Sequence, residues 1–327
     1  MRFFVLGSYM NANFLQMARL PIAGESMQAQ GMWHEHGGKG LNLGIGLHHL
    51  GLSVKILLGI GHDDAGKAVL EVLEQEGMDT SAVMPLGPHS GYGVGFIDTH
   101  GENMLATFAG ANAQMNAQHV LQHFGDMTEQ DWVCAQFEAP EEAILAAFKL
   151  AQQTNAKTYL NPSPWYLPSR ELLALTDVLV VNEIEAALMF GVTKATTWSA
   201  DNWKKMLPDL IYQFEFDCKL LQFEFDCKLL LVTLGSNGVV GCINKSEILY
   251  HPAWPITQID ATGAGDAFSC GLLWGYAQGL PLAQILPFAN ACGALVAAAQ
   301  DVLVALPRVD QVEQFILEHK SAWGSAD

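Results

Sequence analysis

Short runs of apolar residues, each bounded by turn-forming residues, alternate along this chain with longer segments in which apolar positions recur at helical spacing. This alternation is typical of a mainly parallel β-sheet, because consecutive parallel strands are usually joined by a helical crossover. We therefore predict an α/β fold in three layers, with a mainly parallel central sheet and helices on both of its faces. The runs expected to form its strands are Phe3–Gly7, Val54–Gly59, Trp132–Phe137, Thr158–Leu160, Val178–Val181 and Leu229–Leu234.

Two stretches interrupt the alternation. Residues from about 12 to 36 and from 91 to 108 are extended and partly polar, with turn-forming residues at Pro21–Gly24 and His100–Glu102. We predict that together they form one small β lid beside the central sheet.

A tandem duplication stands in the second half of the chain. Residues 213–221 and residues 222–230 both read QFEFDCKLL, and nothing similar occurs elsewhere. A repeat architecture needs about three units to bury a continuous core, so two copies predict a local duplication that lengthens a helix-to-strand connection. We expect it to bulge out at the surface. The sequence is compatible with a natural origin and with an artefact.

Composition and charge narrow the class of protein. Of the 327 residues, 50% are hydrophobic and 31 are glycine, which suits a large core with many tight turns. The net charge of −18 repels nucleic-acid phosphates and anionic lipid headgroups, so we expect no nucleic-acid partner. The most apolar stretch, Ala289–Leu306, is interrupted by polar residues, so we expect no membrane span. The six cysteines form no CxxC pair and we see no secretory leader at Met1, which predicts a cytoplasmic protein.

The segment from Ile259 to Phe268 carries the strongest chemical signal. Gly263 and Gly265 precede small and apolar residues at helical spacing, so backbone N–H groups can converge on an anion at a helix N-terminus. Asp266 then lies in the first helical turn, where a carboxylate can accept the proton of an attacking hydroxyl. The alternative is a helix-capping aspartate after a glycine turn, and the segment alone favours neither.

A second glycine turn, His36–Asn42, leads into another predicted helix. Glycines let a small ligand approach the backbone closely, and Lys39 and Asn42 supply hydrogen-bonding groups that suit a polyol. Taken alone, this segment is better explained as a tight turn with a solvated lysine.

Asn182 and Glu185 follow an apolar strand and lie one helical turn apart. Ligands of open α/β sheets bind at this carboxyl edge, and oxygen ligands of this kind can hold Mg²⁺ through its waters. The same spacing also fits a helix N-cap with its capping-box glutamate. Both interpretations can hold together.

Three other motifs are set aside. Gly61–Ala68 nearly matches the GxxxxGKS/T phosphate-binding loop, but Ala68 has no hydroxyl for Mg²⁺, which excludes a P-loop enzyme. No GxGxxG motif follows the first strand, so nicotinamide binding is disfavoured. His34 and His36 share a strand face without a third ligand nearby, so we interpret them as ordinary exposed histidines.

Taken together, these segments resemble the ribokinase-like (PfkB-type) carbohydrate kinases, and the resemblance covers residues 1–327 as one kinase domain. Each segment is a weak signal by itself, whereas seven in the family's order are specific. The segments are Gly7-Ser8 with Asn11, Gly37–Gly40, Ala109–Asn112, Asn161-Pro162, Asn182–Glu185, Thr233–Gly238 and the one around Asp266.

The resemblance implies a set of roles. Asp266 deprotonates the sugar hydroxyl, and the amides of Gly263, Ala264 and Gly265 stabilise the charge on the phosphoryl group that ATP donates. Asn182 and Glu185 organise Mg²⁺ and the phosphates, with Glu185 acting through water. The nucleotide site is lined by Thr233, Gly235 and Gly238, with Asn290 near the base, and the sugar is held by Asn11, Gly38, Lys39, Asn42 and Glu138. The lid closes over the sugar and also forms a homodimer contact.

The chain departs from the family's pattern at two places, one in the sugar site and one in the site for a monovalent cation. Ribose-specific members grip two sugar hydroxyls with an aspartate, and this chain has Asn13 at that substrate-binding position, a weaker acceptor that can also donate. The polar loop of potassium-activated members is replaced by the mostly apolar Gln300–Ala305, while Asp260 remains as a possible ligand for a monovalent cation. Dependence on K⁺ is left open.

The sequence therefore predicts ATP-dependent phosphorylation of a hydroxyl, expected to be primary, on a small sugar, with a ribose-like sugar favoured. A nucleoside is the second candidate substrate, because Phe14, Trp33, Phe96 and Phe108 are available to form a wall for its base. A catalytically silent sugar-binding sensor is a different class, and the intact Asp266 argues against it. A Rossmann-type oxidoreductase has little support.

Overall fold

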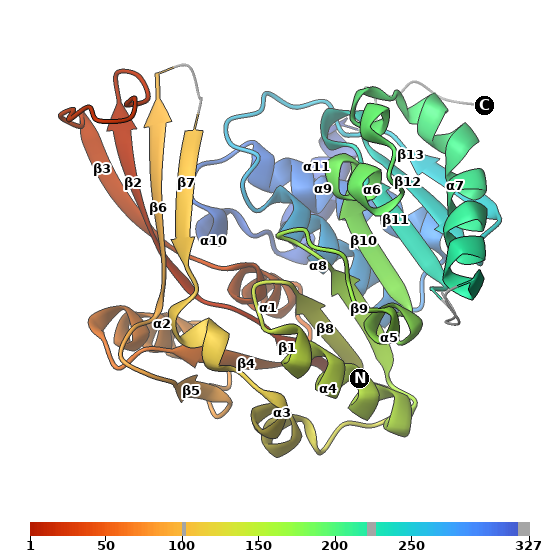
Figure 1. Cartoon of the computed structure of the whole chain (residues 1–327), viewed down its shortest axis with the longest axis horizontal. Helices are drawn as coiled ribbons and strands as arrows, with labels where there is room; N and C mark the ends of the chain where they lie inside the picture. Colours follow the sequence, from red (N-terminus) through yellow and green to blue (C-terminus); the bar gives the residue numbers. More distant parts are fainter. Residues whose placement is uncertain (100–102, 221–226, 320–327) are drawn as a thin grey trace.

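The computed structural model describes residues 1–99, 103–220 and 227–319. Within them, one large sheet has nine strands in the order β13-β12-β11-β10-β9-β8-β1-β4-β5 (Figure 1). Neighbouring strands from β11 to β5 pair in parallel, and β12 and β13 are antiparallel additions at one edge. All six predicted strands are present. The bounds are β1 Phe3–Leu6, β4 Val54–Ile60, β5 Val83–Pro85, β8 Trp132–Gln136, β9 Lys157–Asn161, β10 Val178–Asn182, β11 Leu229–Thr233, β12 Val239–Ile243 and β13 Glu247–His251.

Helices cover both faces of this sheet, as the apolar strand runs predict. Successive side chains of a strand point to opposite faces, so Phe3 and Val5 belong to one core cluster while Phe4 and Leu6 belong to the other. The first cluster is covered by α1 (Lys39–His49), α2 (Asp64–Gln75), α8 (Ala264–Ala277), α9 (Leu282–Ala297) and α11 (Val309–His319). The second is covered by α3 (Ala117–Phe124), α4 (Glu141–Thr154), α5 (Arg170–Ala174), α6 (Glu183–Met189) and α7 (Ala200–Leu220). The three-layer prediction is confirmed.

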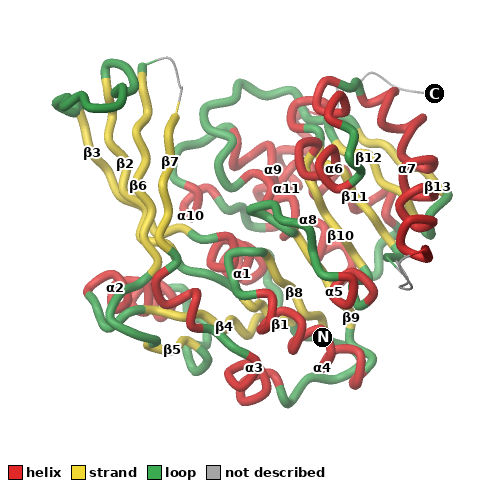
Figure 2. Tube along the Cα trace, in the orientation of Figure 1, coloured by secondary structure: helices red, strands yellow, loops and turns green. Residues whose placement is uncertain are grey.

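A separate small sheet stands at the side of this body, as Figure 2 shows. Its strands are β2 (Met10–Met17), β3 (Gly31–Gly37), β6 (Gly91–Asp98) and β7 (Asn103–Phe108), in the order β3-β2-β6-β7. They fall in the two stretches predicted to be extended. The turn expected at 100–102 lies outside the described residues.

The N-terminus of α8 depends on one glycine conformation. Gly263 has φ 74°, in the left-handed region that glycine adopts without a steric cost. A β-carbon on Gly263 would lie 2.3 Å from Cγ1 of Val302, which begins the short helix α10 (Val302–Ala305). Both effects restrict this position to glycine.

Of the helices within the described residues, none is both long enough and apolar enough to cross a membrane.

The two copies of the duplicated segment have different secondary structures. Most of the first copy, residues 213–220, forms the end of α7, where Phe214 packs edge-on against Phe190 with ring centroids 5.9 Å apart. The second copy supplies buried Cys227 and the first two residues of β11, Leu229 and Leu230. Residues 221–226 lie outside the described residues, so the predicted surface bulge stays a prediction.

Deleting nine residues from this segment is expected to preserve folding. Deletion of either copy gives the same chain, and the remaining copy can provide both Phe214 and Glu215 of a shortened α7 and the Leu-Leu start of β11. The midpoint of thermal unfolding should stay within about 3 °C of the intact chain, with turnover retained. Removing residues 200–208 of α7 instead, which include buried Trp203, is the control and should unfold the protein. An unfolded product from the first deletion would refute the expectation.

Gly263→Ala should destabilise the fold by about 2 kcal/mol or more, because the new side chain meets both a left-handed backbone and Val302. Gly265→Ala is the matched variant: its β-carbon would have no atom within 4 Å, and alanine favours a helix. Chemical denaturation of both variants checks this. Equal stabilities would contradict the steric explanation.

Candidate active site

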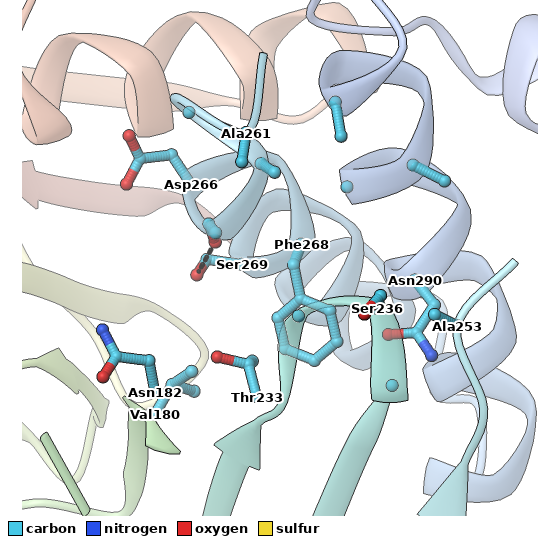
Figure 3. Close-up of a pocket in the computed structure, with 18 of the residues that line it drawn as sticks. Val180, Asn182, Thr233, Ser236, Ala253, Ala261, Asp266, Phe268, Ser269 and Asn290 are labelled. Carbon is cyan, nitrogen blue, oxygen red and sulfur yellow. Dashed lines mark hydrogen bonds between the residues drawn. The ribbon is translucent and has the colours of Figure 1, made fainter. Parts of the chain in front are cut away.

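A cavity of about 820 Å³ lies at the carboxyl ends of three neighbouring parallel strands (Figure 3). The last residues of β9, β10 and β11, which are Asn161, Asn182 and Thr233, line one side of it. The N-terminal turn of α8 and one face of α9 line the other side. The cavity therefore lies at the sheet edge where open α/β folds bind ligands.

Asp266 is held in a defined position in the first turn of α8. Its side chain is only 7% exposed, and its Oδ2 accepts a hydrogen bond of 2.8 Å from Nδ2 of Asn42 on α1. Its Oδ1 lies 4.0 Å from Nζ of Lys39. Two predicted segments that are far apart in sequence are thus joined at one carboxylate, which also lines the cavity.

The first turn of α8 presents backbone amides to the same cavity. Gly263, Ala264 and Gly265 all line it, as predicted for an anion site. The Ala264 amide donates to the carbonyl of Ala261 at 3.2 Å, so it is already used in a turn. Among the described residues, no acceptor is found for the amides of Gly263, Gly265 and Asp266. These three amides, with the helix dipole, are best suited to bind a charged oxygen.

Lys39 is a cation placed among carboxylates. Burial lowers the pKa of its ammonium group, and neighbouring carboxylates raise it, Asp266 most strongly. The carboxylates outweigh burial, so the pKa of Lys39 lies above its ordinary value and the side chain is charged at neutral pH. Lys39 is therefore not a solvated lysine in a simple turn, because its side chain is only 29% exposed and faces Asp266.

Glu138 anchors the glycine turn that precedes α1. Its Oε2 accepts hydrogen bonds from the hydroxyl of Ser8 and, at 2.8 Å, from the backbone N–H of Lys39. Gly38 has φ 110°, and a β-carbon there would lie 2.5 Å from the carbonyl oxygen of Ser8. The turn is therefore fixed close to the backbone of the loop that follows β1.

Two buried acceptor atoms in this region have no hydrogen-bond partner among the described residues. They are Oδ1 of Asn42 and Oε1 of Gln136, whose amide nitrogen donates to the carbonyl of Lys39 at 3.3 Å. Buried polar atoms are normally paired, so these two are exceptions; both are shielded from solvent, and neither residue lines the cavity. Sequence reasoning missed Gln136, since it ends an apolar strand.

Asn182 and Glu185 form the predicted capping box of α6. Asn182 accepts from the Glu185 amide at 2.8 Å, and Glu185 accepts from the Asn182 amide at 2.9 Å. Both also line the cavity. A carboxylate has further lone pairs, so Glu185 fits a water-mediated Mg²⁺ site while capping the helix. No group of three or more His, Cys, Asp or Glu side chains that could hold a metal ion occurs within the described part of the chain.

The other predicted residues divide into two groups. Gly235, Gly238 and Asn290 line the cavity together with Thr233. Asn11 and Asn13 lie on β2 of the small sheet, outside the cavity wall, with Nδ2 of Asn13 donating to the carbonyl of Asn11 at 3.2 Å.

Asp260, the predicted cation ligand, does not line the cavity either. Its Oδ1 accepts from the amide and hydroxyl of Thr262 at 2.9 and 2.7 Å. This carboxylate shapes the loop that leads to α8.

A buried chain of hydrogen bonds behind the anion site was also missed. The hydroxyl of Tyr159 donates to Oγ of Ser269 at 2.6 Å, and Ser269 donates to the carbonyl of Gly265 at 2.8 Å. Burial raises the pKa of Tyr159 well above its ordinary value, so the phenol remains a neutral donor. A tyrosine in an apolar strand gives no functional signal, whereas Ser269 could have been found from its position one turn after Asp266.

Comparison with known proteins identifies the family of this chain. The chain matches the model of the pfkB family carbohydrate kinases over residues 2–307. It is 27% identical over 318 residues to the ribokinase of Haemophilus influenzae, covering 96% of this chain and 98% of that protein. The structure of Arabidopsis thaliana ribokinase complexed with ribose and ATP superposes with TM-score 0.79 at 23% identity, covering 96% and 98% of the two chains.

A nucleoside kinase from Burkholderia thailandensis, in complex with inosine, has the same fold, with TM-score 0.74, 22% identity and coverage of 97% and 98%. Since the family model spans nearly the whole sequence, this chain belongs to the pfkB family of carbohydrate kinases.

Proposed function

We propose that this chain transfers the terminal phosphoryl group of ATP to a primary hydroxyl of a ribose-like sugar. The observation that carries the proposal is the buried carboxylate of Asp266, fixed by Asn42 beside the available amides of α8. The Haemophilus relative is named a ribokinase, and the Arabidopsis structure holds ribose and ATP, which supports the same donor and substrate class here.

In the proposed reaction Asp266 acts as the general base. It accepts the proton as the sugar oxygen attacks the γ-phosphorus, while the bond from that phosphorus to the bridging oxygen breaks and ADP leaves. The amides of Gly263, Gly265 and Asp266 donate to the oxygens of the transferring group, and the dipole of α8 stabilises their charge. Lys39 balances the local negative charge.

The sugar is proposed to lie between the glycine turn and the small sheet. Asn42 is proposed to hydrogen-bond its hydroxyls, and Gly38, Lys39 and Glu138 to bound it from the turn. Asn11 and Asn13 project from the same face of β2, so closure of the small sheet would bring both to the sugar. The small sheet is thus proposed to act as a lid.

Two cations belong to the proposal. Mg²⁺, when bound with the nucleotide, neutralises phosphate charge, and Glu185 would hold it through water. Asp260 would be the side-chain ligand of a monovalent cation such as K⁺. Its carboxylate already receives two hydrogen bonds from Thr262, which leaves its second oxygen for that role.

The lid is also proposed as the contact of a homodimer in the cytoplasm. Large apolar side chains on it are exposed, including Met32 at 76%, Leu105 at 60% and Phe108 at 57%. Exposed apolar groups concentrated on one sheet typically mark an interaction surface.

A nucleoside is the second candidate substrate, and one observation favours it. Tyr92 and Phe108 are paired across β6 and β7, and Tyr92 is the neighbour of Asn11 on β2, so all three share a lid face. Phe14 and Trp33 stack on the opposite face, with ring centroids 5.3 Å apart. An aromatic pair beside the proposed sugar ligand could hold a base, as a nucleoside kinase requires.

A substrate panel tests this function. ATP consumption should be stimulated by one member of a set of pentoses, hexoses and nucleosides in the presence of Mg²⁺, with and without K⁺. Stimulation by ribose supports the first candidate, and stimulation by nucleosides alone supports the second. Sugar-induced thermal stabilisation without ATP turnover would instead indicate a sugar-binding sensor.

Asp266→Asn should reduce turnover by about 10²–10⁴-fold with little change in sugar binding, because only the proton acceptor is lost. Steady-state kinetics and sugar-induced thermal stabilisation measure the two effects. The control is Asp64→Asn, an aspartate in the first turn of α2 with a fully exposed side chain, and it should keep full turnover. If the Asp266→Asn variant turns over at an unchanged rate, Asp266 is not the general base.

A further inference from the structure

Two buried hydroxyl groups form a chain of hydrogen bonds that ends at the first turn of α8. The hydroxyl of Tyr159, on β9, lies 2.6 Å from Oγ of Ser269, and that Oγ lies 2.8 Å from the carbonyl oxygen of Gly265. Figure 3 shows Ser269 below Asp266, on the part of α8 that lines the cavity. The side chain of Tyr159 is fully buried and does not line the cavity, so a bound ligand would not touch its hydroxyl.

The chemistry of the three groups fixes the direction of this chain. A carbonyl oxygen can only accept a hydrogen bond, so Ser269 gives its one proton to Gly265. Tyr159 then donates its own proton to a lone pair of Ser269. Burial raises the pKa of the Tyr159 phenol well above its ordinary value, so this proton stays in place. Each bond therefore points towards the carbonyl of Gly265.

The carbonyl of Gly265 belongs to the same planar peptide unit as the amide N–H of Asp266. In a trans peptide the C=O and the N–H point in opposite directions, so fixing one of them fixes the other. Here the C=O points along α8 to Ser269, and the N–H points out of the helix N-terminus. This N–H is one of the three amides that have no acceptor among the described residues. A hydrogen bond to the carbonyl also polarises the unit, which makes the N–H a stronger donor.

Gly265 makes this peptide unit easy to displace. Glycine has access to more backbone conformations than other residues, and a β-carbon at this position would meet no atom within 4 Å. The first turn of a helix also lacks the intrahelical partners that the N–H groups of later turns have. The hydrogen bond from Ser269 therefore supplies an additional constraint where the helix is least constrained.

We propose that Tyr159 and Ser269 are positioning residues, which hold the peptide unit between Gly265 and Asp266 so that its N–H faces the transferring phosphoryl group. The inference rests on the proposed function, in which the N-terminus of α8 stabilises that group. Donors aimed at the charge of a transition state raise kcat rather than the affinity for the substrate. Loss of the chain should therefore lower kcat and leave nucleotide binding nearly unchanged.

The test removes the two hydroxyls singly and together. Ser269→Ala should lower kcat by about tenfold and Tyr159→Phe by about threefold, with the KM for ATP within about twofold of the intact chain in both. The double variant should match Ser269→Ala, because the hydroxyl of Tyr159 acts through Ser269. Losses that multiply in the double variant would overturn the inference.

Thr176→Val is the matched control. Thr176 is buried, and its Oγ1 donates at 2.8 Å to the carbonyl of Leu172, which is also four residues earlier in the chain. It precedes β10, whose other end, at Asn182, lines the cavity. This variant loses the same kind of hydrogen bond away from the anion site, so its thermal stability should fall while kcat is kept. An equal loss of kcat in Thr176→Val would overturn the inference, since general destabilisation would then explain Ser269→Ala.

Binding of an analogue of the transition state gives a second readout that does not need turnover. Aluminium fluoride mimics the transferring phosphoryl group, so the intact chain should bind MgADP more tightly in its presence. Ser269→Ala should reduce this gain by about tenfold, while calorimetry shows unchanged binding of MgADP alone. If this pattern appears and no sugar or nucleoside is phosphorylated, the proposed function fails and the inference stands. If both hydroxyl variants keep kcat and the full gain, the inference is overturned.

Discussion

The close packing of α1 against α8 is the constraint on which the site depends. A β-carbon on Gly46 of α1 would lie 2.4 Å from Sγ of Cys270 on α8, so only a glycine lets the two helices approach this far. That approach allows Asn42 to reach Asp266 across 224 residues of sequence, and it sets both helix N-termini against one cavity. A wider spacing would separate the carboxylate from the glycine turn, because a side-chain hydrogen bond of 2.8 Å tolerates little displacement.

The charge of the molecule makes this local arrangement important. A chain with a net charge of −18 repels an anionic nucleotide at long range, and salt screens that repulsion beyond about 8 Å. Attraction must therefore act at short range, within the cavity itself. The chain's own groups that supply it there are the ammonium of Lys39, kept charged by its carboxylate neighbours, and the unpaired amides that begin α8. The net charge of the protein thus repels the nucleotide from a distance, whereas the groups in the cavity attract it at close range.

Periodicity was sufficient to predict the layers of the fold. In β1 every residue is apolar, which indicates burial on both faces, and its side chains do enter two separate cores. The first-turn position of Asp266 was also readable, since glycines before a helical pattern define a helix start. The partners of side chains could not be predicted in this way. Tyr159, for example, looks like an ordinary core residue in the sequence, and only the fold brings its hydroxyl to Ser269. Likewise, spacing alone could not assign Asn11 to a separate sheet, because that depends on which strands become neighbours.

The duplicated segment shows how little of the chain's conformation is local. Among the described residues, one matched pair shows this: Leu220 ends α7 in the first copy and Leu229 begins β11 in the second, so intrinsic propensity is identical and the surroundings decide. Leu229 and Leu230 enter opposite cores of the sheet. The segment is an internal comparison of two environments, in which one amino-acid change can be placed in helix and strand within a single molecule.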